Sequence, residues 1–248
     1  MIDNNLINYS KDGSGTERPA VVFLHGWRSS KEVWQGIIGK LGQTGRTIYR
    51  LDLPGFGNSP APQRGFTISD YAALVAGFIK KQNLNKVVLI GHSFGGRIGI
   101  KLAATAPDVV EKLVLADSAG FAMKSAKKSG YGLAAKLVKP FFKPSFMQGL
   151  RKRIYKLIGA EDYLATPALQ KTFVNAVSED LSEDMKKIVS PTLIVFGEKD
   201  MDTPKEFGSR MRGLILNSRL EVLEGAGHFS FLDKPDEFAR FLTEFVSQ

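Results

Sequence analysis

The chain has 248 residues, no cysteine and a formal net charge of +9, and 43% of its residues are hydrophobic. The length suits one large domain with an insertion, and the absence of cysteine excludes disulfides, a thiol nucleophile and thiolate metal sites. No apolar run reaches the roughly 20 residues that span a bilayer, and the first ten residues lack the basic segment and apolar core of a signal peptide, so a cytoplasmic protein is expected.

Short runs of Val, Ile, Leu and Phe recur along the chain, and each ends in Gly, Asp or Pro. Such runs are typical of strands that are buried on both faces of a parallel sheet. They predict strands at residues 20–26, 46–53, 86–91, 111–117 and 191–197. Apolar residues at helical spacing predict helices at 67–83, 95–107 and 235–248. This alternation predicts an α/β fold in which helices flank a mostly parallel central sheet.

The segment 118–190 interrupts the alternation because it contains no clear strand. A structureless loop of that length is implausible in a compact domain. Helical patterning recurs within the segment, as in GLAAKLVKPFFKP and PALQKTFVNAVSED. We therefore expect a helical cap at 118–190, inserted after the strand that ends near Asp117, and a core formed by residues 1–117 and 191–248.

The motif GHSFG, from Gly91 to Gly95, lies where a predicted strand meets a predicted helix. A sharp turn of this kind lifts a serine hydroxyl clear of the sheet and aims backbone N–H groups at developing negative charge. The alternatives are a glycine-rich turn without chemistry and a phosphate cradle. The cradle is disfavoured because the chain has neither a P-loop nor a G-x-G-x-x-G motif. Ser93 is therefore the candidate nucleophile, provided that a base accepts its proton.

The chain has only three histidines, so the candidate base can be found by elimination. His25 ends the first predicted strand. His92 precedes Ser93 on the same tight turn, so its side chain is expected to point away from the hydroxyl. His228 follows a predicted strand at 219–224 and precedes the last helix. Because a parallel sheet holds its site at the carboxyl ends of its strands, His228 is the predicted base.

The base in turn needs an acceptor that fixes its tautomer and stabilises its charged form. Asp200 follows a buried strand and lies between the nucleophile and the base in the sequence. Asp202 and Asp117 are alternatives, and each of the three could instead cap a helix or lie in a solvated turn. Asp202 precedes a Thr-Pro pair, which favours a capping or turn role. Asp200 is therefore the predicted acid.

With these residues in place, the chain resembles the α/β-hydrolase superfamily over almost its whole length. The order Ser93, Asp200, His228 is the family's nucleophile–acid–histidine order. HGW at 25–27 resembles the family's oxyanion turn, and DLPGFGNS at 52–59 resembles its D-x-P-G-x-G-x-S loop. The insertion after the strand near residue 117 falls where capped members of the family carry a lid.

The resemblance also implies further roles in the site. The backbone N–H groups of Trp27 and Phe94 would hold the oxyanion. His25, Gly26 and Phe229, together with residues of the cap, would lie against the substrate. The resemblance implies neither a metal nor an organic cofactor.

The identity of the nucleophile narrows the range of reactions that the resemblance implies. Haloalkane dehalogenases and epoxide hydrolases of the family use an aspartate at this turn, so Ser93 favours a carboxylesterase that cleaves a small-molecule ester through an acyl-enzyme. One alternative is a C–C bond hydrolase for meta-cleavage products of aromatic degradation. Those enzymes usually have a tryptophan where this chain has Phe229, and a cap arginine for which Arg151 and Arg153 are candidates. A binding or receptor module on the same fold is the other alternative, which the intact triad disfavours.

The net positive charge is concentrated in the expected cap. Residues 118–160 contain ten Lys or Arg residues and no acidic residue. The favoured interpretation is a solvated helical face above an apolar underside. A second interpretation is a surface that makes weak contact with an anionic membrane or with acidic substrates. A nucleic-acid partner is not expected, because no recognition motif accompanies the charge.

Overall fold

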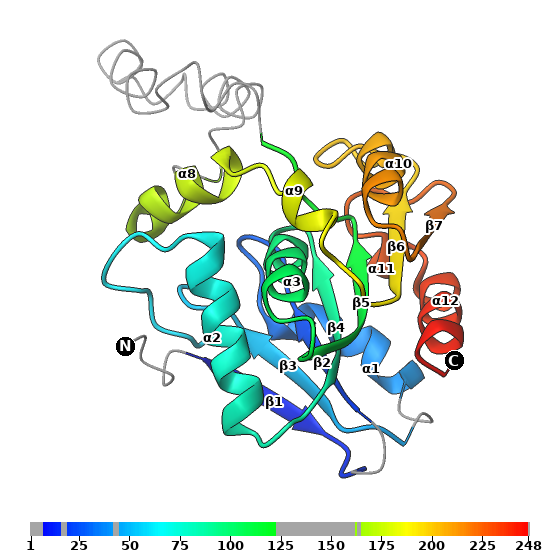
Figure 1. Cartoon of the computed structure of the whole chain (residues 1–248), viewed down its shortest axis with the longest axis horizontal. Coiled ribbons are helices and arrows are strands. Elements are labelled where there is room, and N and C mark those ends of the chain that lie inside the picture. Colours follow the sequence, from blue (N-terminus) through cyan, green and yellow to red (C-terminus); the bar gives the residue numbers. More distant parts are fainter. Residues whose placement is uncertain (1–6, 16–18, 42–44, 123–161, 163–164, 248) are drawn as a thin grey trace, which may run out of the picture.

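The computed structural model describes residues 7–15, 19–41, 45–122, 162 and 165–247 (Figure 1). They contain a seven-stranded sheet with the order β1-β3-β2-β4-β5-β6-β7. β1 pairs with β3 in antiparallel orientation, and all other neighbours are parallel. The strands are β1 (Asn8–Asp12), β2 (Ala20–Leu24), β3 (Ile48–Asp52), β4 (Val87–His92), β5 (Val110–Ala116), β6 (Thr192–Gly197) and β7 (Ser218–Leu223). The prediction of a mostly parallel sheet is confirmed.

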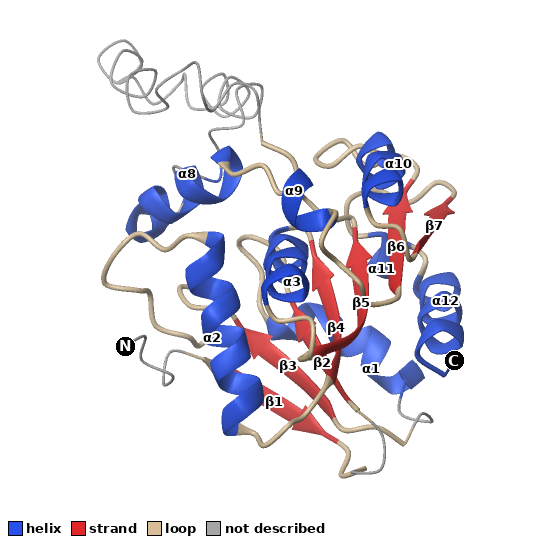
Figure 2. Cartoon of the chain, viewed as in Figure 1, coloured by secondary structure: helices blue, strands red, loops and turns tan. Residues whose placement is uncertain are grey.

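Helices cover both faces of this sheet (Figure 2). One face packs against α2 (Ile68–Lys81), α3 (Phe94–Thr105) and α10 (Lys205–Leu214), and the other against η2 (Lys31–Trp34), α1 (Gln35–Leu41), α11 (Ser230–Asp233) and α12 (Pro235–Ser247). Side chains along β2 alternate between the two cores: Val22 and Leu24 join the first, and Val21 and Phe23 join the second. Burial on both faces explains why the strands are continuous apolar runs.

β1, α1 and α10 were not predicted from the sequence. β1 has the sequence NYSKD, and its residues are exposed or half-buried. It has no apolar run because it lies at the edge of the sheet, where its pairing with β3 defines it. α10 carries only two buried residues, Gly208 and Met211, so its apolar periodicity is weak.

The described part of the segment that the sequence assigns to a cap contains η5 (Pro167–Leu169), α8 (Gln170–Ser178) and α9 (Ser182–Met185). The backbone N–H of Phe66 donates to the Thr172 hydroxyl (2.9 Å), and Asn175 donates to the Phe66 carbonyl (3.1 Å), so α8 is bonded to the loop before α2. Residues 123–161, which hold most of the basic stretch together with Arg151 and Arg153, lie outside the described residues. The cap and its membrane contact therefore stay predictions.

None of the helices in the described ranges is long and apolar enough to cross a membrane.

Arg97 on α3 joins the two ends of the segment 118–190. Its guanidinium is buried and donates to the carbonyls of Phe121 (2.6 Å) and Glu179 (2.8 Å). The backbone N–H of Leu181 donates to the Gly120 carbonyl (2.9 Å), so the two ends also bond to each other. Burial lowers the pKa of Arg97 to about 10, which leaves the guanidinium charged at neutral pH. The helix that follows Ser93 therefore fixes where this segment leaves the core and where it returns.

Replacing Arg97 with methionine is expected to lower the free energy of unfolding by about 2–4 kcal/mol, because one buried and one partly buried carbonyl lose their charged donor. Urea denaturation of the wild type and the variant measures this difference. Arg212→Met, at an exposed position on α10, is the matched control and should unfold within about 0.5 kcal/mol of the wild type. Equal midpoints for the two variants would contradict an anchoring role for Arg97.

Candidate active site

Ser93 lies between the end of β4 at His92 and the start of α3 at Phe94. Its backbone has φ 50° and ψ −108°, a conformation that a residue with a side chain rarely adopts. Hydrogen bonds hold it there: the Ser93 N–H donates to the Ala116 carbonyl (3.1 Å), and its own carbonyl accepts from Gly96 (3.1 Å). The strand-to-helix turn expected at GHSFG is therefore present.

The two glycines of this motif are required by close backbone approach. A Cβ on Gly91 would lie 2.5 Å from the Gly95 carbonyl oxygen, and one on Gly95 would lie 2.5 Å from the Leu24 carbonyl oxygen. Real Cβ atoms do not approach a backbone oxygen this closely. Gly91 is therefore needed for the turn to close on itself, and Gly95 for it to pack against β2.

Three side chains from distant parts of the sequence form one hydrogen-bonded chain. His228 Nε2 lies 3.1 Å from Ser93 Oγ, and His228 Nδ1 lies 2.9 Å from Asp200 Oδ2. Ser93 follows β4, Asp200 follows β6, and His228 follows β7. All three strands are parallel, so their carboxyl ends meet at one edge of the sheet. The structure thus brings together the three residues that the sequence assigned to nucleophile, base and acid.

Asp200 accepts four hydrogen bonds. Its Oδ1 accepts from the N–H groups of Asp202 (2.8 Å) and Thr203 (2.9 Å), and its Oδ2 accepts from the Thr203 hydroxyl (2.7 Å) and His228. Burial works against ionisation, but the bonds from His228 and Thr203 outweigh it and hold the pKa of Asp200 below its ordinary value. Asp200 is therefore an ionised acceptor whose orientation is fixed.

The electrostatic balance at His228 favours its charged form. Burial lowers its pKa, whereas the hydrogen bond and the charge of Asp200 raise it, and the net effect is a pKa above the ordinary value. With Asp200 holding the proton on Nδ1, Nε2 is the lone pair that faces the Ser93 hydroxyl. The ring can therefore take a proton from Ser93 and is stabilised once it is charged.

The other two histidines have structural partners. His92 is buried, its Nε2 bonds to the His228 carbonyl (2.8 Å), and burial lowers its pKa to about 3. His25 is also buried: its Nε2 accepts from the Leu53 N–H (3.0 Å), its Nδ1 donates to the Gly26 carbonyl (2.7 Å), and burial lowers its pKa to about 4. Both rings are neutral near pH 7. The His25 ring has no free nitrogen, so this residue shapes the turn rather than offering a side-chain contact to a substrate.

Asp117, one of the alternative acids, does not bond to His228. Its carboxylate is buried and accepts from the Gly197 N–H (2.7 Å) and from the N–H (3.0 Å) and hydroxyl (2.6 Å) of Ser230. Burial raises the pKa of Asp117 to about 7 against these bonds. Asp117 therefore ties the ends of β5 and β6 to the start of α11, two residues after His228.

Trp27 and Phe94 are the two residues whose N–H groups are expected to bind the oxyanion. Trp27 follows β2, which pairs with β4, and Phe94 follows Ser93 directly. Among the described residues, neither the Trp27 N–H nor the Phe94 N–H donates a hydrogen bond. The Trp27 ring contacts Phe56 (4.9 Å between centroids), Phe94 (5.1 Å) and Phe173 (5.2 Å). These four rings form an aromatic cluster, which α8 completes through Phe173.

Gly26 and Phe229 lie close to the histidines. A Cβ on Gly26 would lie 2.7 Å from His92 Nδ1, so glycine is needed for the two turns to pack together. The Phe229 ring is 37% exposed and lies 4.8 Å from the His92 ring and 5.5 Å from the His228 ring. Phe229 therefore presents an apolar surface beside the candidate base.

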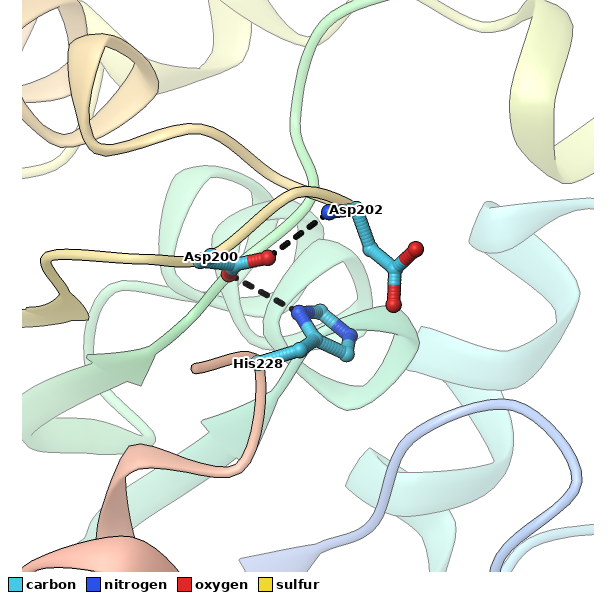
Figure 3. Close-up of side chains that lie close together, drawn as sticks. All are labelled: Asp200, Asp202 and His228. Carbon is cyan, nitrogen blue, oxygen red and sulfur yellow. Dashed lines mark hydrogen bonds and ion pairs between the residues drawn. The ribbon is translucent and has the colours of Figure 1, made fainter. Parts of the chain in front are cut away.

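Asp200, Asp202 and His228 are also the one group in the described part of the chain whose spacing suits a metal ion, with one ligand atom of each within 4.8 Å of the others (Figure 3). Both oxygens of Asp200 already accept two hydrogen bonds each. A metal on Asp200 would have to displace its bond to His228. The donor set therefore fits the hydrogen-bonded chain to Ser93 and not a resident metal.

Sequence reasoning missed two contributors. The Thr203 hydroxyl lies 2.7 Å from Asp200 Oδ2, 2.9 Å from the Asp117 carbonyl and 3.2 Å from His228 Nδ1, and its single proton can be donated to either of the two oxygens. Its only signal in the sequence is its position three residues after Asp200. Phe173 joins the aromatic cluster from α8, and its only signal in the sequence is its place in the helically patterned stretch PALQKTFVNAVSED.

A profile of the Alpha/beta hydrolase family matches residues 21–241. Because this match spans most of the chain, the protein belongs to the alpha/beta hydrolase family and is a hydrolase of that family. The resemblance to the α/β-hydrolase superfamily that the sequence motifs indicated is thereby confirmed.

Similar proteins include several whose activity is named. The chain is 31% identical over 245 residues to a pimeloyl-[acyl-carrier protein] methyl ester esterase of Neisseria meningitidis serogroup C, covering 91% of this chain and 93% of that protein. It resembles the structure of an esterase from Exiguobacterium antarcticum with a TM-score of 0.76 and 29% identity, covering 98% of this chain and 96% of the other. A meta-cleavage product hydrolase from Pseudomonas fluorescens IP01 shares the fold, with a TM-score of 0.72, 22% identity and coverage of 96% and 93%.

Proposed function

We propose that the protein is a serine carboxylesterase that cleaves small-molecule esters through an acyl-enzyme. The observation that carries this proposal is the chain of hydrogen bonds from Ser93 Oγ through His228 to Asp200, at 3.1 Å and 2.9 Å. The two relatives at 29% and 31% identity that are named as esterases support the choice of an ester substrate.

Acylation begins with neutral His228, which accepts the Ser93 proton at Nε2 while Oγ bonds to the ester carbonyl carbon. The imidazolium that forms is stabilised by the Asp200 carboxylate at Nδ1. His228 then gives the proton to the alcohol oxygen as the carbon–oxygen bond breaks, which leaves an acyl group on Ser93. In deacylation, His228 takes a proton from water, the hydroxide adds to the acyl carbon, and Ser93 leaves with the proton as the acid is released.

Each tetrahedral intermediate carries a negative oxygen that needs fixed donors. The backbone N–H groups of Trp27 and Phe94 would supply two, because neither donates elsewhere in the described part of the chain. Phe94 is also the first residue of α3, whose N-terminus favours negative charge. The aromatic cluster around Trp27 supports an apolar acyl group next to this position.

C–C bond hydrolysis remains the second candidate reaction. The meta-cleavage product hydrolase from Pseudomonas fluorescens IP01 supports only the shared fold, because it is 22% identical to this chain. The cap arginine expected for that reaction has its candidates, Arg151 and Arg153, outside the described residues. A binding module without turnover is the third candidate. The bonded chain at Ser93 supports the enzyme over this module, because a receptor needs no activated hydroxyl.

A substrate panel separates these three functions. We expect the wild type to hydrolyse short-chain p-nitrophenyl esters and methyl esters of longer acyl chains, offered both free and on acyl carrier protein, and to leave a meta-cleavage product unchanged. An organophosphate should label Ser93 with a stoichiometry near one, because the site makes that hydroxyl nucleophilic. Turnover of the ring-cleavage product alone would favour the C–C hydrolase, and absence of both turnover and labelling would favour the binding module.

A further inference from the structure

Asp202 places a second carboxylate beside the candidate base. It lies in the loop between β6 and α10, and its own N–H donates to Asp200 Oδ1 (2.8 Å). The carboxylate that bonds to His228 thus also fixes the backbone of Asp202. One ligand atom each of Asp200, Asp202 and His228 lies within 4.8 Å of the others. Figure 3 shows Asp200 at one end of the imidazole and the Asp202 carboxylate extending past its other side.

The Asp202 side chain makes no other interaction in the described part of the chain that would explain its position. It is exposed, and its carboxylate makes no hydrogen bond or ion pair there. The sequence suggested a capping or turn role for Asp202. The structure gives its side chain no cap contact, since α10 begins after Pro204 and no side-chain cap bond is present at its start. Among the residues that the structure describes, the exposed charge therefore faces the imidazole without a partner that would neutralise it.

We propose that Asp202 is a positioning residue for the general base. Its carboxylate stabilises the protonated His228 ring through space, so the enzyme loses activity at a higher pH on acidification than it would without this charge. The proposal rests on the proposed function, because it assigns His228 the part of the base. It does not add a ligand to the site. Its effect acts only on the balance between the neutral and the charged imidazole.

The other charged and titratable groups around His228 are compatible with an effect of Asp202 on the protonation of the ring. Asp200 bonds to Nδ1, and His92 packs 4.9 Å away, centroid to centroid. Asp202 adds negative charge from the loop after β6, whereas Asp117, whose pKa burial raises to about 7, adds negative charge only where it is ionised. After burial, which lowers the pKa of His228, the contributions that raise it come from Asp200 first and then from Asp202 and Asp117. His92 is neutral near pH 7 because burial lowers its pKa to about 3.

The sign of the effect follows from the proton that His228 must accept. The free enzyme is active when His228 is neutral, so activity rises as the pH passes through the pKa of His228. Removing the negative charge at Asp202 destabilises the imidazolium and lowers this pKa. The acid limb of kcat/KM therefore moves to lower pH. Because the charge is exposed, we expect a shift of about 0.3–1 pH unit, and a smaller one at high salt.

A titration of the histidine rings by NMR tests the proposal without requiring turnover. The variants are Asp202→Asn, the charge-retaining Asp202→Glu, and the control Asp108→Asn, which removes an exposed carboxylate just before β5, at the opposite edge of the sheet. His25 and His92 have pKa values lowered to about 4 and about 3, whereas the pKa of His228 is raised above its ordinary value, so the His228 titration is separated from the other two. Asp202→Ser replaces the Asn variant if the latter does not fold.

We expect Asp202→Asn to lower the pKa of His228 by about 0.3–1 unit and to shift the acid limb of ester hydrolysis equally, with a smaller change in 1 M NaCl. Asp202→Glu and Asp108→Asn should stay within about 0.2 unit of the wild type. An unchanged pKa in Asp202→Asn, or an equal shift in Asp108→Asn, would overturn the proposal. If the pKa shifts while no ester is hydrolysed, the electrostatic role stands and the proposed function fails.

Discussion

Ser93→Ala is expected to lower kcat for a short-chain ester at least about 10⁴-fold, because no other hydroxyl lies within reach of His228 Nε2 in the described part of the chain. Alanine keeps the same Cβ, so the strained turn meets no new steric contact. The variant should therefore fold like the wild type and bind the substrate while failing to form an acyl-enzyme. The expected loss of kcat is therefore a loss of the chemical step and not of the stability of the fold.

Steady-state kinetics and active-site titration with an organophosphate measure this effect together. Ser209→Ala, at an exposed position on α10, is the matched control and should keep wild-type turnover and labelling. Residual activity within tenfold of the wild type in Ser93→Ala would exclude Ser93 as the nucleophile. A variant with an altered unfolding midpoint would show that the turn depends on the hydroxyl itself.

Asp200→Asn is expected to reduce kcat about 10²–10⁴-fold through the wrong tautomer of the base. The backbone N–H groups of Asp202 and Thr203 donate to Oδ1, so the single oxygen of an asparagine would be held there. Its NH₂ group would then face His228 Nδ1 and donate to it. The ring proton would move to Nε2, where it points at Ser93 and blocks acceptance of the hydroxyl proton.

The matched control for this change is Asp202→Asn, the same substitution two residues later, which should change kcat at the pH optimum less than about tenfold. The pH profile separates the two variants further. Asp202→Asn should shift the acid limb and keep the plateau, whereas Asp200→Asn should lower the plateau itself. Similar losses in both variants would mean that Asp200 acts only as one more nearby charge.

The buried strands and the turn at Ser93 were predictable because each depends on a short stretch of sequence. β4 is a run of apolar residues, and Gly91 and Gly95 mark a place where a strand must meet a helix at very close range. β1 was not predictable in this way. Its residues are exposed or half-buried, so nothing local marks a strand that is defined by its partner β3.

The choice among the three aspartates shows where local sequence patterns stop predicting the role of a residue. Asp117, Asp200 and Asp202 all follow buried strands by a few residues, and the sequence ranked them by order and by neighbouring turn residues. In the structure Asp200 bonds to His228, Asp117 holds the loop that carries His228, and Asp202 stands beside the ring without a bond. Thr203, which links the first two, was not noticed because a single threonine carries no pattern.

The sequence by itself determined the class of fold, the serine at the turn and the histidine that bonds to it, because these follow from apolar periodicity, from glycine spacing and from a choice among three histidines. Its motifs also carried the resemblance to the family that the profile match confirms. Only the tertiary structure decided which carboxylate meets the imidazole and which rings surround Trp27. The physical reason is that a hydrogen bond depends on distances of about 3 Å between loops of different strands. Those distances are set by how the parallel strands pack side by side, and no spacing along the chain encodes them.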